Sequence, residues 1–379
     1  DEERYERVIE TWTETTEKVT DATTEKTSDT SSEETTEPSG DTKPVIWTLG
    51  DSTVCNYTAE NVENYNYRQG WGMRLGDYFT DDVTVKDIAI SGRSTRDFPV
   101  YNDGVNKGAN YKDFTTNVKP GDYVLIQFGH NDQKEPLKAG SEAGTYVING
   151  NYGKTDANGG ISSAAGLKDW KNADENGYLT IAGVPSVEGT CTEGGKLPSF
   201  EWLLYNKYVK VALDKGAIPI LVTPIVRANG TKNASGVYDT LDKIDQTHEK
   251  VNWKVIGPLV TDENLTSMNY IQAVKDVAAY AKEQGYDVPV IDLYADSCNY
   301  WTQYIADHGT VNALHANDKG KVGVKDRTHL SRLGAFAASG LVANEIKEQN
   351  LGLAKYLKAT FPTAPLDGIS AGDDDTTAK

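Results

Sequence analysis

Cysteine is scarce in this chain, and its spacing excludes the common metal sites. The 379 residues include three cysteines, Cys55, Cys191 and Cys298, and none belongs to a C-x-x-C pair. We therefore predict no zinc site and no other metal. The odd number permits one disulfide at most. Cys191 with Cys298 is one possibility, and three buried thiols are an equal alternative.

Basic stretches and long apolar runs are missing as well. The net charge is −18 and no Lys/Arg run is present, which argues against nucleic acid as a partner and against anionic membrane surfaces. No apolar run approaches the roughly 20 residues of a membrane span. No signal-peptide pattern precedes the folded part, but a secreted chain whose signal peptide had been removed or trimmed would also show none.

The first 43 residues differ in composition from the rest. They contain 14 acidic residues, 5 basic residues and 12 threonines, with few large apolar groups after Trp12. Such a segment buries too little surface to offset its ordering entropy, so we predict a disordered acidic linker over residues 1–43. Residues 362–379 return to this composition and are predicted to be a second linker. Linkers at both ends favour one module of a longer secreted chain.

Between residues 44 and 361, short apolar runs alternate with segments of helical periodicity. Five runs bounded by Gly, Pro or Asp predict strands: Val45–Leu49, Val83–Ile90, Tyr123–Gly129, Ala217–Pro224 and Val288–Leu293. Apolar residues three and four apart predict helices over Ser199–Gly216, Met268–Gly285 and Arg332–Asn350. The alternation predicts an α/β fold, a three-layer α/β/α sandwich with a five-stranded parallel sheet. Two polar, Gly-rich stretches, 135–198 and 227–267, are predicted to be insertions beside the functional edge.

Four short motifs fall in order next to these elements. GDS (Gly50–Ser52) follows the first strand, SGRS (Ser91–Ser94) the second and GHND (Gly129–Asp132) the third, while DRTH (Asp326–His329) precedes the last helix. Parallel strands bring their carboxyl ends to one edge of a sheet, so we expect the motifs to converge there. Each motif alone is more often a turn, a cap or a structural histidine. Their order and position together indicate a catalytic site.

The residue types in these motifs suit acyl transfer. Ser52 is the predicted nucleophile and His329 its base, with Asp326 orienting the imidazole from three residues away at a loop-to-helix junction. We expect the backbone N–H groups of Ser52 and Gly92 and the side-chain amide of Asn131 to meet the developing oxyanion. Gly92 has no Cβ and so permits close approach of a substrate. This chemistry needs no metal and no organic cofactor.

The sequences of these motifs resemble those of the SGNH, or GDSL-like, hydrolases. The resemblance covers roughly residues 44–349, apart from the two insertions. GDSTV, YRQGWG, SGRS, FGHND and DRTHLS are most similar to the rhamnogalacturonan acetylesterase group. The resemblance implies a flavodoxin-like SGNH hydrolase fold and a secreted or cell-surface bacterial esterase. Its implied reaction removes acetyl groups from plant cell-wall polysaccharide, with pectic rhamnogalacturonan as first candidate and acetylxylan or another acetylated glycan as second.

Two other classes of function stay open. A non-catalytic carbohydrate-binding derivative of the fold would keep the groove but have no use for His329 as a base. A lipid esterase or thioesterase should carry an apolar lid, whereas the predicted insertions are polar and Gly-rich.

Substrate contacts are predicted at Trp71, Arg93, Arg96, His130 and Lys134, with a structural role as the alternative for His130. Basic residues gather around the motifs of an otherwise acidic chain: Arg68, Arg93, Arg96, Arg327, Arg332, Lys134 and Lys325. A locally positive site suits a polymer that bears galacturonate carboxylates. The equally weighted alternative is that these side chains pair with neighbouring acids, Asp51, Asp87, Asp97 and Asp326, and hold the loops.

Overall fold

The structure is a computed structural model, and it describes eleven stretches of the chain. They are residues 43–57, 68–95, 98–100, 108–132, 137–139, 146–148, 178–180, 196–198, 200–242, 270–318 and 321–366. Nearly all of the two predicted linkers, and Cys191, lie outside these stretches. The linkers and the possible disulfide of Cys191 therefore stay predictions.

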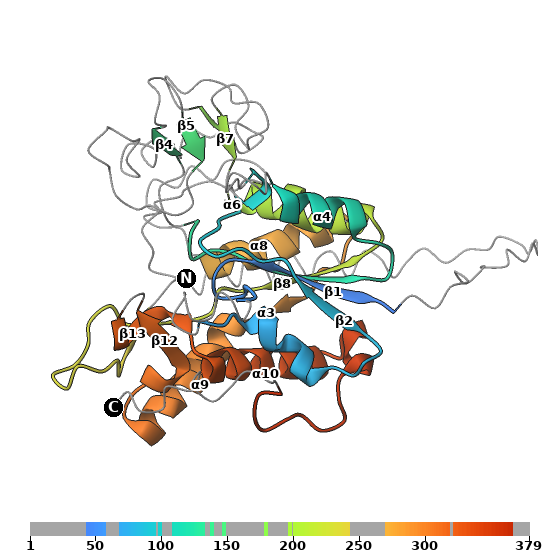
Figure 1. Ribbon diagram of the computed structural model, residues 1–379. Coiled ribbons are helices and arrows are strands. Elements are labelled where there is room, and N and C mark those ends of the chain that lie inside the picture. The colour runs from blue at the N-terminus through green and yellow to red at the C-terminus, as the bar shows by residue number, and fades with distance from the viewer. Residues whose placement is uncertain are drawn as a thin grey trace, which may run out of the picture. The chain divides into compact units, whose positions relative to one another are not determined.

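Five parallel strands form the central sheet, as predicted (Figure 1). They are β1 (Val45–Gly50), β2 (Thr84–Asp87), β3 (Tyr123–Gln127), β8 (Ile218–Val222) and β11 (Val290–Ile291). Their spatial order is β2-β1-β3-β8-β11, the flavodoxin-like order. The chain adds β2 on one side of β1 and then adds β3, β8 and β11 in turn on the other side. In the β1–β3 register, Gly50 faces Gln127, so both strands end at the same level. The residues that follow each strand therefore meet at one edge.

Side chains alternate along each strand between two buried faces of the sheet. Trp47 and Leu49 of β1 pack into one apolar cluster, and Ile46 packs into the other. In β3, Val124 and Leu125 divide between the two clusters in the same way. Because both faces are covered, the interior strands β1, β3 and β8 read as almost continuous apolar runs, which is why their positions were predictable.

Helices cover the two faces in separate layers (Figure 1). One layer contains α4 (Ala109–Asn117), α6 (Phe200–Leu203) and α8 (Tyr270–Glu283). The other contains α3 (Trp71–Arg74), α9 (Leu293–His308) and α10 (Arg332–Glu348). The arrangement is the predicted α/β/α sandwich. None of the helices in the described part of the chain has the length and apolar character needed to cross a membrane.

The predicted strand Val83–Ile90 is shorter in the structure, where β2 spans Thr84–Asp87, and two further predicted elements also differ. The segment Ser199–Gly216 is not one regular helix, because π-helical turns (η4, Leu204–Val209) separate α6 from α7 (Lys210–Asp214). The last predicted strand ends early because the Asp292 carboxylate accepts the Ala295 N–H at 3.3 Å and caps α9. Helices α3, α4 and α9 were not predicted.

Short antiparallel pairs lie in the two predicted insertions. In the first, β4 (Leu137–Ala139) pairs with β5 (Tyr146–Ile148), and β6 (Tyr178–Thr180) pairs with β7 (Lys196–Pro198). In the second, β9 (Arg227–Ala228) pairs with β10 (Leu241–Asp242). The remaining elements are β12 (His315–Asp318), β13 (Lys321–Leu330) and the 3₁₀ turns η1 (Leu75–Tyr78), η2 (Phe98–Val100), η6 (Asn312–Leu314) and η7 (Gly352–Tyr356).

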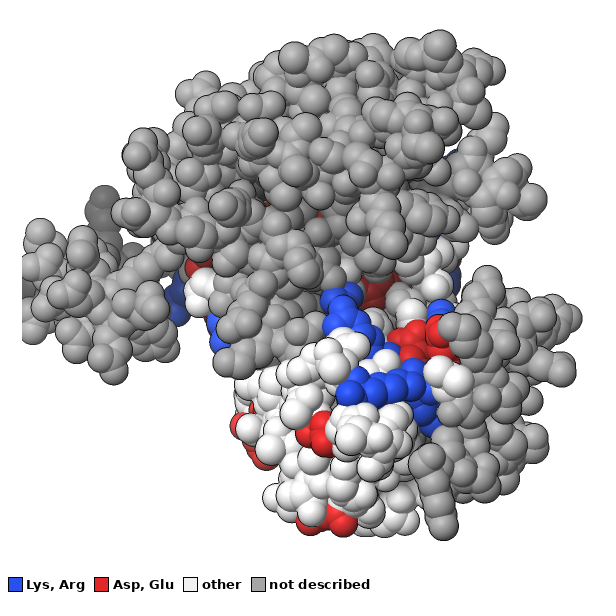
Figure 2. Space-filling model, turned by 90° about the vertical axis from the view of Figure 1, so that its left-hand side faces the viewer, with Lys and Arg blue, Asp and Glu red and all other residues white. Residues whose placement is uncertain are grey.

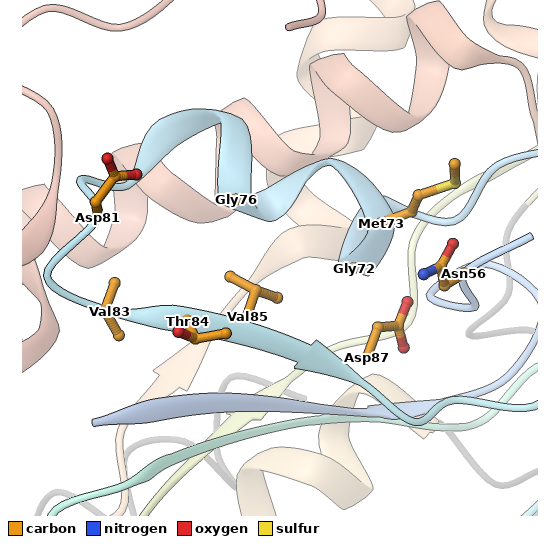
Figure 3. Close-up of a pocket in the computed structure, with 9 residues that line it drawn as sticks. All are labelled: Asn56, Gly72, Met73, Gly76, Asp81, Val83, Thr84, Val85 and Asp87. Carbon is orange, nitrogen blue, oxygen red and sulfur yellow. The ribbon is translucent and has the colours of Figure 1, made fainter. Parts of the chain in front are cut away.

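A polar cleft of about 400 Å³ runs between the edge strand β2 and the α3–η1 segment (Figure 3). Asp87, Asn56 and Met73 are among its lining residues, and none of the predicted catalytic residues lines it. The Asp87 carboxylate accepts the Ala89 N–H at 3.0 Å. Burial raises the pKa of Asp87 to about 8, since its hydrogen bonds offset the desolvation only in part.

This raised pKa predicts how stability changes with pH. A carboxyl group that holds its proton more tightly in the folded than in the unfolded chain stabilises the fold at acidic pH. That contribution is lost as the pH rises from about 4 toward 8. Asp87→Asn mimics the protonated acid and should remove this loss. We expect the Tm of the wild type to fall by about 3 °C or more relative to the variant between pH 5 and pH 8. Parallel Tm curves would show that Asp87 is ionised in the fold.

Candidate active site

Ser52 is held in a tight turn directly after β1. The Asp51 carboxylate accepts the backbone N–H and the hydroxyl of Thr53, each at 2.8 Å. The Asp51 carbonyl accepts the N–H of Val54 at 3.1 Å and that of Cys55 at 3.0 Å. These bonds reverse the chain within a few residues, as Asx turns do. They leave Ser52 at the carboxyl end of β1, an interior strand of the sheet.

The structure brings Ser52, His329 and Asp326 together in hydrogen-bonding distance. Ser52 Oγ lies 3.0 Å from His329 Nε2, and His329 Nδ1 lies 2.7 Å from Asp326 Oδ2. A carboxylate only accepts hydrogen bonds, so Nδ1 carries a proton and Nε2 of the neutral ring accepts the Ser52 hydroxyl. Ser52 and His329 are 277 residues apart in sequence. Their contact is the arrangement that activates a serine nucleophile.

Asp326 and His329 lie on the end of β13, directly before α10, and not in a loop as predicted. The second carboxylate oxygen of Asp326 accepts the backbone N–H of Thr328 at 2.6 Å and that of His329 at 3.0 Å. Burial opposes ionisation of this carboxyl. The adjacent imidazole and these N–H donors outweigh burial and hold the pKa of Asp326 far below its ordinary value. Asp326 is therefore a carboxylate throughout the usual working range of pH.

Gly92 lies in a turn beside the nucleophile. The Arg93 N–H donates to the Ile90 carbonyl at 3.2 Å, and Gly92 has a φ of 77°, a conformation that favours glycine. The Ile90 N–H donates to the Gly50 carbonyl at 3.0 Å, which fixes this turn against the end of β1. The Tyr57 hydroxyl lies 3.3 Å from the Ser52 carbonyl oxygen and ties the nucleophile turn to the same region.

Asn131 follows β3 at the same edge, and its amide is oriented by the Gly92 turn. Its Nδ2 donates to the Arg93 carbonyl at 3.1 Å. An amide nitrogen carries two N–H groups, and the bond that one of them makes here fixes the orientation of the side chain. Asp132, the next residue, accepts the Thr95 N–H at 3.0 Å and binds the Thr95 hydroxyl. The GHND segment is thus hydrogen-bonded to Arg93 of the SGRS segment and to Thr95, the residue that follows it.

His130 does not occupy the predicted substrate-contacting position. It is 2% exposed, and its Nε2 donates to the Ile225 carbonyl at 2.8 Å. Its Nδ1 lies 3.3 Å from Asp51 Oδ2. Burial opposes ionisation of Asp51, but His130 and the Thr53 donors outweigh it and keep the pKa of Asp51 below its ordinary value. This placement supports the structural alternative, since the pair joins the nucleophile turn to the GHND segment.

Trp71 is also buried, contrary to the prediction of a substrate contact. Its side chain is fully enclosed, and its Nε1 donates to Gln127 Oε1 at 2.9 Å. Gln127 Nε2 in turn donates to Thr53 Oγ1 at 2.6 Å. A ring with no exposed surface cannot contact a bound sugar. Trp71 instead starts a buried chain of hydrogen bonds that ends at the Asp51 carboxylate.

The predicted basic residues divide between those the structure places and those it does not. Arg93 lies at the Gly92 turn, where its Nε donates to the Ser91 carbonyl at 3.3 Å. Arg96 and Lys134 lie outside the described residues, so their predicted contacts stay predictions. Arg68 pairs with Asp326 at 3.2 Å, a contact that sequence reasoning left only as an alternative. Within the described stretches, no group of three or more His, Cys, Asp or Glu side chains is placed to hold a metal ion.

Comparisons with known proteins identify a matching family and several relatives of this chain. The model of the GDSL-like Lipase/Acylhydrolase family matches residues 48–321, which include Ser52, Gly92 and Asn131 and end before Asp326. Rhamnogalacturonan acetylesterase RhgT of Bacillus subtilis (strain 168) is 26% identical over 322 residues, 83% of this chain and 95% of that protein. The probable rhamnogalacturonan acetylesterase YesY of the same organism is 24% identical over 313 residues, 82% of this chain and 96% of that protein.

Among solved structures, the YxiM protein of Bacillus subtilis is 23% identical, with a TM-score of 0.44 over 82% of this chain and 58% of that one. The family match spans well over half of the chain, and it begins at the strand that carries the nucleophile turn. With the parallel sheet and the serine–histidine contact at its edge, the chain belongs to the GDSL-like lipase/acylhydrolase, or SGNH, family of hydrolases.

Proposed function

We propose that the protein is a serine esterase that removes O-acetyl groups from a plant cell-wall polysaccharide, with pectic rhamnogalacturonan as the first candidate. The observation that carries the esterase part is the hydrogen-bonded series Ser52–His329–Asp326. The carbohydrate part is supported by two relatives named as a known and a probable rhamnogalacturonan acetylesterase, each aligned over nearly its full length. We also propose that the enzyme acts outside a bacterial cell and is one module of a longer chain.

In the proposed reaction, Ser52 Oγ attacks the acetyl carbonyl carbon while its proton passes to His329 Nε2. The backbone N–H groups of Ser52 and Gly92 and the Asn131 amide stabilise the oxyanion. The imidazolium then gives its proton to the sugar oxygen, the C–O bond breaks, and an acetyl-serine remains. Water, deprotonated by His329, attacks this ester, the bond to Ser52 Oγ breaks, and acetate leaves while His329 returns the proton to Ser52. Asp326 stays ionised throughout and holds the ring in the productive tautomer.

Acetate release from a set of acetylated polymers tests the proposed substrate. Acetylated rhamnogalacturonan, acetylxylan and a long-chain lipid ester are compared at equal ester concentration. We expect the highest kcat/KM on rhamnogalacturonan. A preference for acetylxylan would move the second candidate to the front, and a preference for the lipid ester would overturn the carbohydrate proposal while leaving the esterase mechanism intact.

Charge on the polymer provides a second test of the substrate. Figure 2 shows Lys and Arg side chains next to acidic ones on the described part of the face that forms the left-hand side of Figure 1. Arg93 lies at the Gly92 turn and is partly exposed. If it meets galacturonate carboxylates, Arg93→Gln should raise KM for pectic substrate about two- to fivefold and leave a small neutral acetyl ester unchanged. Added salt should depress the pectic reaction selectively.

Lys210→Gln is the matched control for this charge test. Lys210 pairs with Asp214 on α7 at 2.8 Å, so its loss removes one positive charge without touching the site. It should affect neither substrate. Equal losses on both substrates in Arg93→Gln, with a lower Tm, would mark Arg93 as part of the scaffold and favour acetylxylan.

A further inference from the structure

The segment Arg68–Trp71 connects the two halves of the candidate active site. On one side, the Gly70 N–H donates to the Cys55 carbonyl at 3.0 Å and the Trp71 N–H donates to the Thr53 carbonyl at 2.8 Å. On the other side, the Gln69 N–H donates to the Leu330 carbonyl at 3.1 Å. One short stretch is thus bonded both to the turn that carries Ser52 and to the strand end that carries His329.

Close backbone approach explains the glycine in this segment. A Cβ at Gly70 would lie 2.1 Å from the Val54 carbonyl carbon and 2.3 Å from the Cys55 nitrogen, well inside van der Waals contact. Those atoms are backbone and cannot move aside cheaply. Only glycine allows the segment to lie directly against the nucleophile turn.

Arg68 extends the same connection to the acid of the triad. Its Nη2 lies 3.2 Å from Asp326 Oδ2, the oxygen that also accepts His329 Nδ1–H at 2.7 Å. The guanidinium and the imidazole therefore share one carboxylate oxygen and lie within about 6 Å of each other. Arg68 is 9% exposed, so its charge is weakly screened by solvent.

We infer that Arg68 is a positioning residue of the reaction: its guanidinium opposes protonation of His329 through the shared Asp326 carboxylate and so keeps the base neutral, and able to accept the Ser52 proton, at acidic pH. A positive charge within about 6 Å disfavours an imidazolium. The opposite charge of Asp326 favours it. The positive charge of Arg68 offsets the negative charge of Asp326. Asp326 can therefore orient the imidazole of His329 without also making the ring bind a proton more tightly.

Other titratable groups face the same pair. His315 of β12 pairs with Leu330 of β13. Asp326 and His329 both interact electrostatically with the His315 side chain. Its Nε2 accepts the Trp301 N–H at 3.1 Å, and burial lowers its pKa to about 4, so it is neutral where the enzyme would work. Lys325 and Arg327 flank Asp326 on β13. The Tyr238 hydroxyl interacts electrostatically with both Asp326 and Arg327. These groups are unchanged in the variants below, so they do not confound the comparison.

Removal of the Arg68 charge tests this inference. In Arg68→Met, we expect the acid limb of the kcat/KM profile for a small acetyl ester to move to higher pH by about one unit. Arg68→Gln, which keeps hydrogen-bond donors without the charge, should move it equally, whereas Arg68→Lys should leave it within about 0.3 unit of the wild type. Two neutral variants guard against the failure of one of them to fold.

Arg74→Met is the matched control. Arg74 is a buried arginine of the same region that pairs with Asp77 at 3.6 Å instead of with the triad. Its loss should lower the Tm without moving the acid limb. A limb that stays in place in both neutral Arg68 variants, or moves equally in Arg74→Met, would overturn the inference and leave Arg68 as a structural contact only.

The inference rests on the proposed serine chemistry but not on the polysaccharide, and a second readout separates it from turnover. In Ser52→Ala protein, the His329 ring signals can be followed by NMR against pH with and without Arg68→Met. We expect the titration midpoint of His329 to rise by about one unit in the variant. This shift is independent of any substrate, so an inactive wild type would count against the proposed function and not against the role of Arg68.

Discussion

Ser52→Ala should lose about four to six powers of ten in kcat on a small acetyl ester while it folds normally. The reason is geometric: the Ser52 hydroxyl is the group that lies 3.0 Å from His329 Nε2 at the edge of the sheet. Without it, no acyl-enzyme can form, and only binding and the oxyanion donors would assist attack by water. Stopped assays with purified protein, combined with thermal melts, measure both halves of this prediction.

Ser91→Ala is the appropriate comparison for this loss. Ser91 carries a hydroxyl at the same edge of the sheet. This hydroxyl lies 3.3 Å from the Tyr57 hydroxyl, whereas that of Ser52 lies next to His329. Its removal should cost less than about tenfold, the effect of one neutral hydrogen bond. Turnover by Ser52→Ala at a rate similar to that of Ser91→Ala would contradict the assignment of the nucleophile.

Asn131→Ala should lower kcat by about two to three powers of ten with little change in KM. The Asn131 amide is oriented by its bond to the Arg93 carbonyl, so it is preorganised to meet charge that develops only as Ser52 attacks. Asn131→Asp is a shape-matched second variant, because it replaces the donor with an acceptor of the same size. It should lose at least as much kcat as the alanine variant.

The division of the loss between kcat and KM decides the interpretation of Asn131. An interaction made only in the transition state lowers kcat and kcat/KM together, whereas a ground-state contact raises KM. If only KM changed in Asn131→Ala, Asn131 would be a substrate contact. The oxyanion would then rely on the backbone N–H groups of Ser52 and Gly92.

Much of the fold was predictable because the sheet is buried on both faces. An interior strand then leaves an almost continuous apolar run in the sequence, as in Val45–Gly50, whose inner residues are buried. Helix α9 was missed because its buried positions, Leu293, Ser297 and Trp301, form a narrow stripe among polar residues. The strand before it was predicted too long because Asp292, read as the interior of a strand, is a helix cap.

The meeting of the motifs that follow β1 and β3 was predictable for a different reason. Ser52 and Asn131 follow strands that end at one edge, and topology alone brings such residues together. The contacts of Arg68 with Asp326 and of Trp71 with Gln127 join residues 258 and 56 positions apart. The sequence offered the first pairing only as one alternative among several and gave no sign of the second. Trp71 and His130 were assigned to substrate because polar or aromatic residues beside a catalytic motif read as exposed. In the structure, these two are the buried supports of the motif.

The most direct test of the central claim is covalent labelling of the nucleophile. Diethyl p-nitrophenyl phosphate reacts with a serine only where a base activates the hydroxyl, so it reports the Ser52–His329 contact without any choice of natural substrate. We expect one phosphoryl group per chain, located by mass spectrometry on Ser52, with acetyl ester hydrolysis lost in proportion to labelling. His329→Ala should remain unlabelled. A wild-type protein that hydrolyses the ester but carries the label on another residue, or carries none, would contradict the account.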